Sequence, residues 1–157
     1  MCSSDLATKA AFERGWFRTG DIAVREKGRF RILGRSSTDI IKTGGYKVSA
    51  LEIEGVFATH PEVEECAVVG VEDPVWGERV AAALVIRPGS PLTLEAIMGW
   101  AKERLAGYKI PSQLRIVTAL PRNEMGKVSK QRVGLLFKDA ESAQENEKDI
   151  RARSSGE

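Results

Sequence analysis

Three loops of the chain carry residues that can take part in phosphate chemistry. Lys127 follows Gly126 in a polar loop, where a lysine can neutralise charge that develops on a phosphate or carboxylate. Gly44 and Gly45 let a ligand approach the backbone closely, because glycine has no Cβ. Asp21 opens an expected strand and can accept hydrogen bonds from ribose hydroxyls. Taken singly, each also has a structural explanation: a solvated loop lysine, a hairpin turn and a turn aspartate.

Several classes of site are disfavoured by the residues that the chain contains. It has one histidine, which disfavours a histidine-centred triad or a multi-histidine metal site. Its two cysteines, Cys2 and Cys66, lie far apart and form no CxxC pattern. Neither GxxxxGK[ST] nor GxGxxG occurs, so a self-contained nucleotide hydrolase or dehydrogenase is disfavoured. We predict no metal ligand in this chain.

The composition is typical of a globular protein of one domain with appendages. The 157 residues are 42% hydrophobic and 29% charged, with a formal net charge of +2. No basic stripe indicates nucleic acid as a partner. No apolar run approaches the roughly 18 residues of a membrane span, so none is predicted. The paucity of cysteine favours a reducing compartment, with Cys66 as an unpaired core thiol.

The elements that position these loops begin with two hairpins. Residues 21–25 and 29–33 form the first, and 40–42 and 46–48 form the second, which turns at Gly44 and Gly45. The polar stretch between them suits a linker.

A compact arrangement of helices and strands follows. Ser49 caps a helix that ends at His60, before a proline. Apolar runs at 66–71 and 80–86 predict strands covered on both faces. A helix from Thr93 should end at Gly107. A weaker strand at 114–117 and a final helix at 129–138 complete the prediction.

The predicted fold class is α+β, with a small three-stranded sheet and packed helices, preceded by a β-hairpin. Residues 139–157 contain few apolar side chains, which predicts a disordered tail.

Three segments together resemble one enzyme family. They are Gly-Trp-Phe-Arg-Thr-Gly-Asp at 15–21, the stretch from Gly34 to Glu54, and Pro-Arg-Asn-Glu-Met-Gly-Lys-Val-Ser-Lys at 121–130. In order and spacing they are similar to motifs of the adenylate-forming, AMP-binding acyl-CoA synthetases. The resemblance covers about residues 7 to 136.

This resemblance implies a division of the chain. Residues 1–34 would be the end of a large AMP-binding domain, 35–39 the hinge, 40–138 the C-terminal lid domain and 139–157 the tail. The missing N-terminal large domain would then be the chief partner, and the chain alone is expected to be incomplete and inactive.

The resemblance also implies the reaction and its cofactors. A carboxylate attacks the α-phosphate of ATP, pyrophosphate leaves, and the thiol of CoA then displaces AMP from the acyl-adenylate. ATP, CoA and Mg²⁺ are the implied cofactors, and the magnesium ligand is expected in the large domain.

Roles for individual residues follow from the matched motifs. Lys127 matches the catalytic lysine, and Asp21 and Arg35 match nucleotide-binding residues. Ser37 stands at the hinge position, where the family commonly has Asp or Lys, so Ser36 and Thr38 remain alternatives.

The CoA-binding loop is the other implied site. Gly44 and Gly45 match the loop that lines the pantetheine tunnel, with Lys42 as a weaker phosphate contact. The segment Trp76-Gly77-Glu78 also resembles the family, and we interpret it as structural.

Within the family, the motif sequences are most similar to those of the members that activate malonate. This predicts malonate as the carboxylate and a mitochondrial location, or else a cytoplasmic one. Two alternatives stay open: a synthetase for a fatty or aromatic acid, and a stand-alone CoA- or partner-binding module without catalysis.

Overall fold

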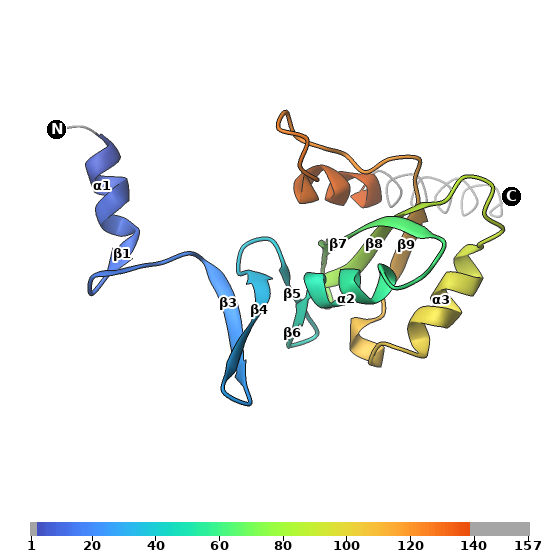
Figure 1. Cartoon of the computed structure of the whole chain (residues 1–157), viewed down its shortest axis with the longest axis horizontal. Coiled ribbons are helices and arrows are strands. Elements are labelled where there is room, and N and C mark those ends of the chain that lie inside the picture. The colour runs from blue at the N-terminus through green and yellow to red at the C-terminus, as the bar shows by residue number, and fades with distance from the viewer. Residues whose placement is uncertain (1–2, 139–157) are drawn as a thin grey trace, which may run out of the picture.

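One twisted sheet forms the centre of the C-terminal part of the chain. The computed structural model describes residues 3–138 (Figure 1). Neighbouring strands in the sheet follow the order β6-β5-β8-β7, and β9 pairs with β8 in parallel. The strands are β5 (Ile40–Thr43), β6 (Tyr46–Ser49), β7 (Val63–Asp73), β8 (Gly77–Ile86) and β9 (Gln113–Ile116).

The α+β class is confirmed, but the predicted count of three strands is wrong. The three expected strands do pair, and the 40–49 hairpin joins them to give five. The junction is a bridge between Thr43 and Gly77, where the Gly44 amide donates to the Trp76 carbonyl at 3.0 Å. A contact between segments more than thirty residues apart leaves no local signal in the sequence, so it was missed.

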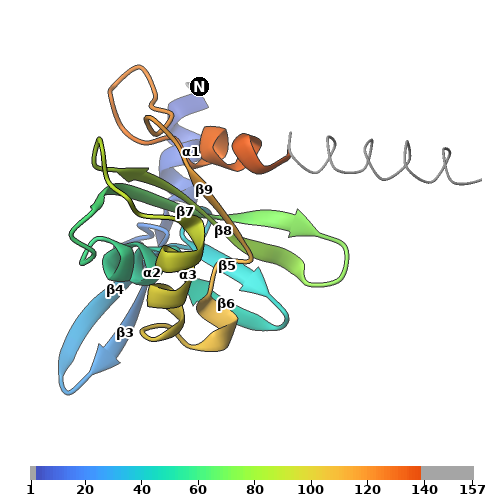
Figure 2. The same cartoon turned by 90° about the vertical axis from the view of Figure 1, so that its right-hand side faces the viewer.

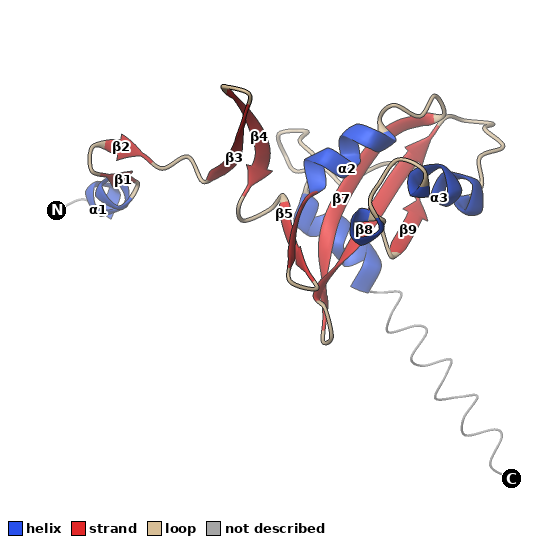
Figure 3. Cartoon of the chain, turned by 90° about the horizontal axis from the view of Figure 1, so that it is seen from below, coloured by secondary structure: helices blue, strands red, loops and turns tan. Residues whose placement is uncertain are grey.

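The long β7–β8 pairing explains the unbroken apolar runs. Alternate residues of the two strands face opposite sides of the sheet. Val68 and Leu84 belong to a buried cluster beneath the helices α2 (Ala50–Phe57) and α3 (Leu94–Lys102). Val69 and Val85 belong to a second buried cluster, which the helix at 130–138 covers (Figure 3). Each strand is therefore apolar on both faces.

The helix starts agree with the sequence, but two predicted ends do not, since α2 ends at Phe57 and not at His60. The Ser49 and Thr93 hydroxyls accept the Glu52 and Ala96 amides at 3.2 Å, which caps α2 and α3. The helix α3 ends at Lys102, and the predicted terminator Gly107 instead opens a short 3₁₀ turn, Gly107–Lys109. Leu105 still packs into the core, and so the apolar pattern runs beyond the helix.

The N-terminal part extends away from this sheet (Figures 1 and 2). The predicted hairpin is present as β3 (Asp21–Glu26) and β4 (Arg29–Arg35). A short helix, α1 (Ser3–Ala10), and a small ribbon of β1 (Phe12–Glu13) and β2 (Trp16–Phe17) precede it and were not predicted. Aromatic side chains in this part are exposed, among them Trp16 at 81%.

Other expectations can be compared with the described residues. No helix within residues 3–138 is long and apolar enough to cross a membrane. Cys66 is half-buried against the core, and burial raises the pKa of its thiol, with a further contribution from Glu54. Cys2 and the predicted tail at 139–157 lie outside the described residues.

Phe57 provides a test of the core. Its side chain is fully buried, so Phe57→Ala should lower the free energy of unfolding by about 3–5 kcal/mol. Phe30→Ala is the matched control, because Phe30 is 75% exposed and should change stability by only about 0.5 kcal/mol. Urea unfolding followed by circular dichroism measures both. Equal losses would show that α2 does not pack as described.

Candidate functional site

The hairpin β3–β4 brings the two predicted nucleotide-binding residues together. Asp21 and Arg35 are register partners at the open end of the hairpin, and Arg35 Nε lies 3.7 Å from Asp21 Oδ1. The Arg35 side chain is 71% exposed and that of Asp21 36%. An exposed pair at this distance is held weakly, so both groups remain available to a ligand.

The predicted hinge is a tight turn between β4 and β5. The Thr38 and Asp39 amides donate to the Arg35 carbonyl at 3.3 and 2.8 Å. Ser37 is exposed within this turn. In the other direction, the Arg35 amide donates to Asp39 Oδ2 at 2.9 Å. The side chain of Asp39 thus bridges the turn.

Charge compensation keeps Asp39 ionised. Burial raises the pKa of this carboxyl, but the hydrogen bond from Arg35 and the ion pair with Lys130 outweigh it, and the pKa lies below its usual value. Lys130 Nζ lies 2.9 Å from Asp39 Oδ1 and 2.8 Å from Glu54 Oε1. Neither Asp39 nor Lys130 was singled out from the sequence, and their charges gave no sign of a buried contact.

The loop that carries Lys127 is closed by its own hydrogen bonds. Arg122 and Val128 form an antiparallel bridge at its base. Asn123 Oδ1 accepts the Met125 amide at 3.0 Å and the Lys127 amide at 2.9 Å. This loop is therefore a defined structure rather than a loose connection.

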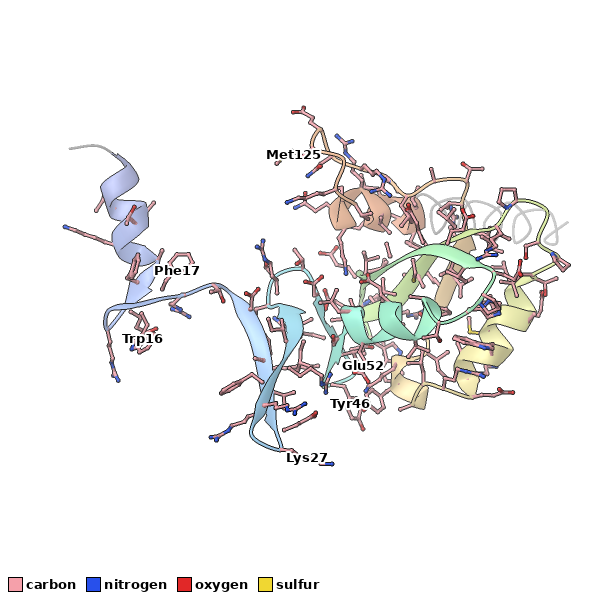
Figure 4. The ribbon with its side chains drawn as sticks, in the orientation of Figure 1. Trp16, Phe17, Lys27, Tyr46, Glu52 and Met125 are labelled. Carbon is pink, nitrogen blue, oxygen red and sulfur yellow. The ribbon has the colours of Figure 1, made fainter. Side chains whose placement is uncertain are left out.

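Lys127 itself projects from the loop. Its side chain is exposed, and its ammonium takes part in none of the ion pairs found among residues 3–138. Figure 4 shows the neighbouring Met125 at the tip of the loop, pointing away from the sheet. In the described part of the chain no contact joins Lys127 to Asp21 or Arg35, so the three predicted residues form two separate groups.

The glycine pair forms the β5–β6 turn, as predicted. Gly44 and Gly45 have φ values of 53° and 83°. A Cβ on Gly44 would lie 2.7 Å from the Trp76 ring, whereas one on Gly45 would meet nothing within 4 Å. The turn is fixed below by Lys42, whose amide donates to Glu78 Oε2 at 2.5 Å. One side of the turn is thus packed and the other is open.

A basic cleft lies beside this turn. Lys42 and Lys47 are cross-strand partners, and both line a cavity of about 470 Å³. Lys109 also lines it, paired with Glu52 Oε1 at 2.6 Å. Next to it, the rings of Tyr46 and Tyr108 stack with their centroids 4.6 Å apart. Figure 4 shows Tyr46 and Glu52 on this side of the molecule.

No group of three or more His, Cys, Asp or Glu side chains is arranged to hold a metal ion within residues 3–138.

Comparison with known proteins identifies the family. Residues 52–127 match the AMP-binding enzyme C-terminal domain. The mitochondrial malonate–CoA ligase of Mus musculus is 52% identical over 78% of this chain and 21% of its own length. The chain carries the C-terminal domain of the AMP-binding, adenylate-forming enzymes.

Solved structures agree with this family. The crystal structure of ATP-bound MatB from Rhodopseudomonas palustris is 36% identical, with a TM-score of 0.77. It covers 88% of this chain, which spans 28% of MatB. Apo MatB, with the same identity and coverage, gives 0.68. The chain therefore spans about a fifth to just over a quarter of the relatives that it matches.

The contact of Trp76 with the glycine turn was missed by the sequence analysis. Our interpretation of Trp76-Gly77-Glu78 as structural fits the contacts of Glu78 and Gly77. Trp76, however, is 54% exposed while its ring lies against Gly44. The Asp73 carboxylate accepts the Val75 and Trp76 amides at 2.9 and 2.8 Å and so fixes this tryptophan. Its partner in the glycine turn could be found only from the fold.

The packed side of the glycine turn gives a second prediction. In Gly44→Ala the new methyl group should displace the Trp76 ring, because the clash is with that ring. The Trp76 indole N–H resonance should shift and broaden in NMR spectra of the chain.

Gly45→Ala is the matched control, since it also has a positive φ but has open space beside it. It should leave the indole resonance in place. Similar spectra for the two variants would contradict the described contact.

Proposed function

We propose that these residues serve an ATP-dependent, AMP-forming acid–thiol ligase, in which they form the hinge and the catalytic lid. The observation that carries the proposal is Lys127, an uncompensated cation on a closed loop within the family's motif. The reaction has two steps. A carboxylate oxygen bonds to the α-phosphorus of ATP as the bond to pyrophosphate breaks, and the CoA sulfur then bonds to the acyl carbon as AMP leaves with the thiol proton passing to solvent.

Lys127 would act in the first step. Negative charge on the phosphoryl oxygens and the incoming carboxylate must be brought together, and a fixed ammonium offsets their repulsion. Glu124 lies in the same loop but forms no ion pair with Lys127 in the described part of the chain, so the full charge is available to the substrates. The hydrogen bonds of Asn123 would hold the loop so that the lysine needs little reorganisation.

Asp21 and Arg35 would bind the nucleotide. The carboxylate accepts hydrogen bonds from the two ribose hydroxyls, and the guanidinium contributes positive charge near the phosphate. Their weak mutual contact at 3.7 Å is easily exchanged for contacts with a ligand.

The glycine turn would bind CoA in the second step. Open space beside Gly45 suits the passage of the narrow pantetheine chain along the backbone. Lys42 and Lys47, which share one face of the hairpin, are placed to attract the phosphates of CoA.

Malonate is the carboxylate that we propose, supported by the malonate–CoA ligases, in which about half of the aligned residues are identical to this chain. Mitochondria are the proposed location on the same ground. Mg²⁺ would accompany ATP and be held by residues outside this chain. Fatty and aromatic acids are the alternatives, which a panel of carboxylates would separate.

A large AMP-binding domain is the proposed partner. The division into residues 1–34, a hinge at 35–39 and a lid at 40–138 is supported by the exposed aromatic side chains of the N-terminal part. Trp16, Phe17 and Phe30 are 81%, 60% and 75% exposed, and such aromatic surface is characteristic of a covered interface.

The overall arrangement of the chain is more similar to the ATP-bound form of MatB than to the apo form. Over the same share of the chain, the TM-score with MatB is 0.77 for the ATP-bound form and 0.68 for the apo form. This supports the proposal that the chain is arranged as in the ATP step.

Lys127→Ala tests the proposal in a fused ligase, in which this chain replaces the matching C-terminal part of MatB. The rate of adenylation, measured as release of pyrophosphate, should fall by about 100- to 1000-fold. Acyl transfer from preformed acyl-adenylate to CoA should change far less, because in that step no carboxylate has to approach the charged phosphate.

Lys102→Ala, an exposed lysine on α3, is the control and should leave both rates unchanged. An equal loss of both half-reactions in Lys127→Ala would refute the role given to Lys127.

Gly45→Ala tests the CoA path in the same fused ligase. The new methyl group would project into the open space, so acyl transfer at limiting CoA should slow by about 10-fold while adenylation is retained. Gly89→Ala is the matched control, because Gly89 has a φ of 77°, close to the 83° of Gly45. A Cβ on Gly89 would also meet nothing within 4 Å. If both variants lose transfer equally, backbone strain and not ligand clearance is responsible.

A further inference from the structure

A chain of polar contacts connects the nucleotide-binding residues with the segment that follows the catalytic lysine. Arg35 pairs with Asp21 through its side chain and with Asp39 Oδ2 through its amide. The other oxygen of Asp39 contacts Lys130 Nζ at 2.9 Å. Lys130 stands three residues after Lys127, at the start of the helix at 130–138. We call the three residues Arg35, Asp39 and Lys130 the hinge bridge.

Asp39 belongs to the lid although it ends the hinge turn. Its carbonyl accepts the Ala50 amide at 2.7 Å, where α2 begins. Its carboxylate is held by Lys130, and Lys130 is held in turn by Glu54 on α2. Glu54 Oε1 also accepts the Val68 amide at 2.7 Å, which fixes it to the central sheet. Asp39 must therefore move with the sheet and its helices.

Arg35 belongs to the other side of the turn. It ends β4 and is paired with β3. A rotation within residues 36–38 separates Arg35 from Asp39, so the hydrogen bond between the Arg35 amide and Asp39 Oδ2 must change when the lid turns. The hydrogen bond from the Asp39 amide to the Arg35 carbonyl must change as well, whereas the contacts of Asp39 with Lys130 and Ala50 lie within the lid and can persist.

The charged side chains around Lys130 are close-packed and largely shielded from water. The side chains of Asp39, Glu54 and Lys130 are 14%, 18% and 20% exposed. A Cβ on Gly34 would come within 2.4 Å of Asp39 Cβ, so the backbone of β4 also lies against this side chain. In such surroundings a carboxylate keeps its position only while its cationic partner is present.

We propose that Asp39 and Lys130 are positioning residues for adenylation. Lys130 fixes the Asp39 carboxylate, Asp39 closes the hinge turn on Arg35, and the lid is thereby held where Lys127 serves the ATP step. For its place in the reaction this inference rests on the function proposed above. The closure of the turn by the hinge bridge stands independently of any reaction.

The closure can be measured on the chain itself, without substrate. Hydrogen exchange of the Arg35 amide, read by NMR, reports the bond to Asp39 directly. In Lys130→Met the carboxylate loses its anchor, and this amide should exchange about 10-fold faster, while amides of β7 and β8 keep their rates.

Lys109→Met is the matched control for this measurement. Lys109 also pairs with a glutamate of α2, at 2.6 Å, and its side chain is likewise 20% exposed, but its contacts are with Glu52 and Tyr108 and not with Arg35 or Asp39. It should leave the Arg35 amide unchanged. Unaltered protection of Arg35 in a folded Lys130→Met chain would overturn the proposal.

Asp39→Asn supplies a second variant of nearly unchanged shape. It keeps an oxygen that can accept the Arg35 amide but has no charge to pair with Lys130, so exchange at Arg35 should again rise. Unchanged exchange would overturn the anchoring role of charge. If both variants fail to fold while Lys109→Met folds, the three charges serve fold stability and the proposal is wrong.

The half-reactions of the fused ligase then test the positioning role. Lys130→Met should slow adenylation by about 100-fold and leave transfer from acyl-adenylate nearly unchanged, and Lys130→Arg should restore most of the adenylation rate. Lys102→Met controls for loss of a lysine.

The two proposals fail in different ways. If Lys127→Ala shows no loss specific to adenylation, the proposed function fails. If Lys127→Ala behaves as expected but Lys130→Met slows both steps equally or neither, only the positioning role fails.

Discussion

The pairing of β7 with β8 is the constraint on which the rest of the lid depends. These strands are apolar on both faces, so each face needs a cover of its own. One cover is α2, which carries Glu54, and the other is the helix at 130–138, which carries Lys130 at its first turn. The turn between the two strands carries Trp76 and supports the glycine turn. Burial of one sheet thus sets the positions of three segments that carry chemistry.

A mobile lid has to be rigid within itself and weakly held at one place. Within the lid, buried apolar clusters lie on both sides of the sheet, and the loop of Lys127 is closed by the side chain of Asn123. Across the hinge, the turn at 36–39 is closed by a few hydrogen bonds, chief among them that of Asp39. A rotation there must also break the hydrogen bond from the Ser49 hydroxyl to the Leu33 carbonyl, which joins the start of α2 to β4. Residues with few buried neighbours can absorb such a change at low cost.

Much of the fold could be predicted from the sequence because its signals are local. The helix caps at Ser49 and Thr93 and the turns of both hairpins depend on neighbouring residues, and the structure confirms them. The strand β5 was predicted as part of a separate hairpin, because its bridge to Gly77 depends on a distant segment. The early helix end at Lys102 was missed because Leu105 continues the apolar period after the helix has stopped.

The residues of the candidate site likewise divide into those that local motifs predict and those whose contacts depend on distant segments. Lys127, Asp21, Arg35 and the glycine pair could be named because they stand in recognisable motifs, and their contacts are consistent with those motifs. The turn at Gly28 fixes the hairpin register as far as Ala23, and a β-bulge between Ile22 and Ala23 then shifts the register by one residue, which brings Asp21 opposite Arg35. The part of Trp76 beside Gly44 could not be foreseen, since nothing in the sequence places one against the other.

Two lysines three residues apart show why burial, and not residue type, assigns a role. Lys127 leaves its loop toward solvent, and its charge is free for a substrate. Lys130 turns inward, where two carboxylates from distant segments already surround it. If Lys127 were buried and Lys130 exposed, the Lys127 ammonium could not reach a substrate, and the carboxylates of Asp39 and Glu54 would have no cation beside them. The first turn of the helix at 130–138 separates the two, since it rotates one side chain toward the sheet while the preceding loop directs the other outward.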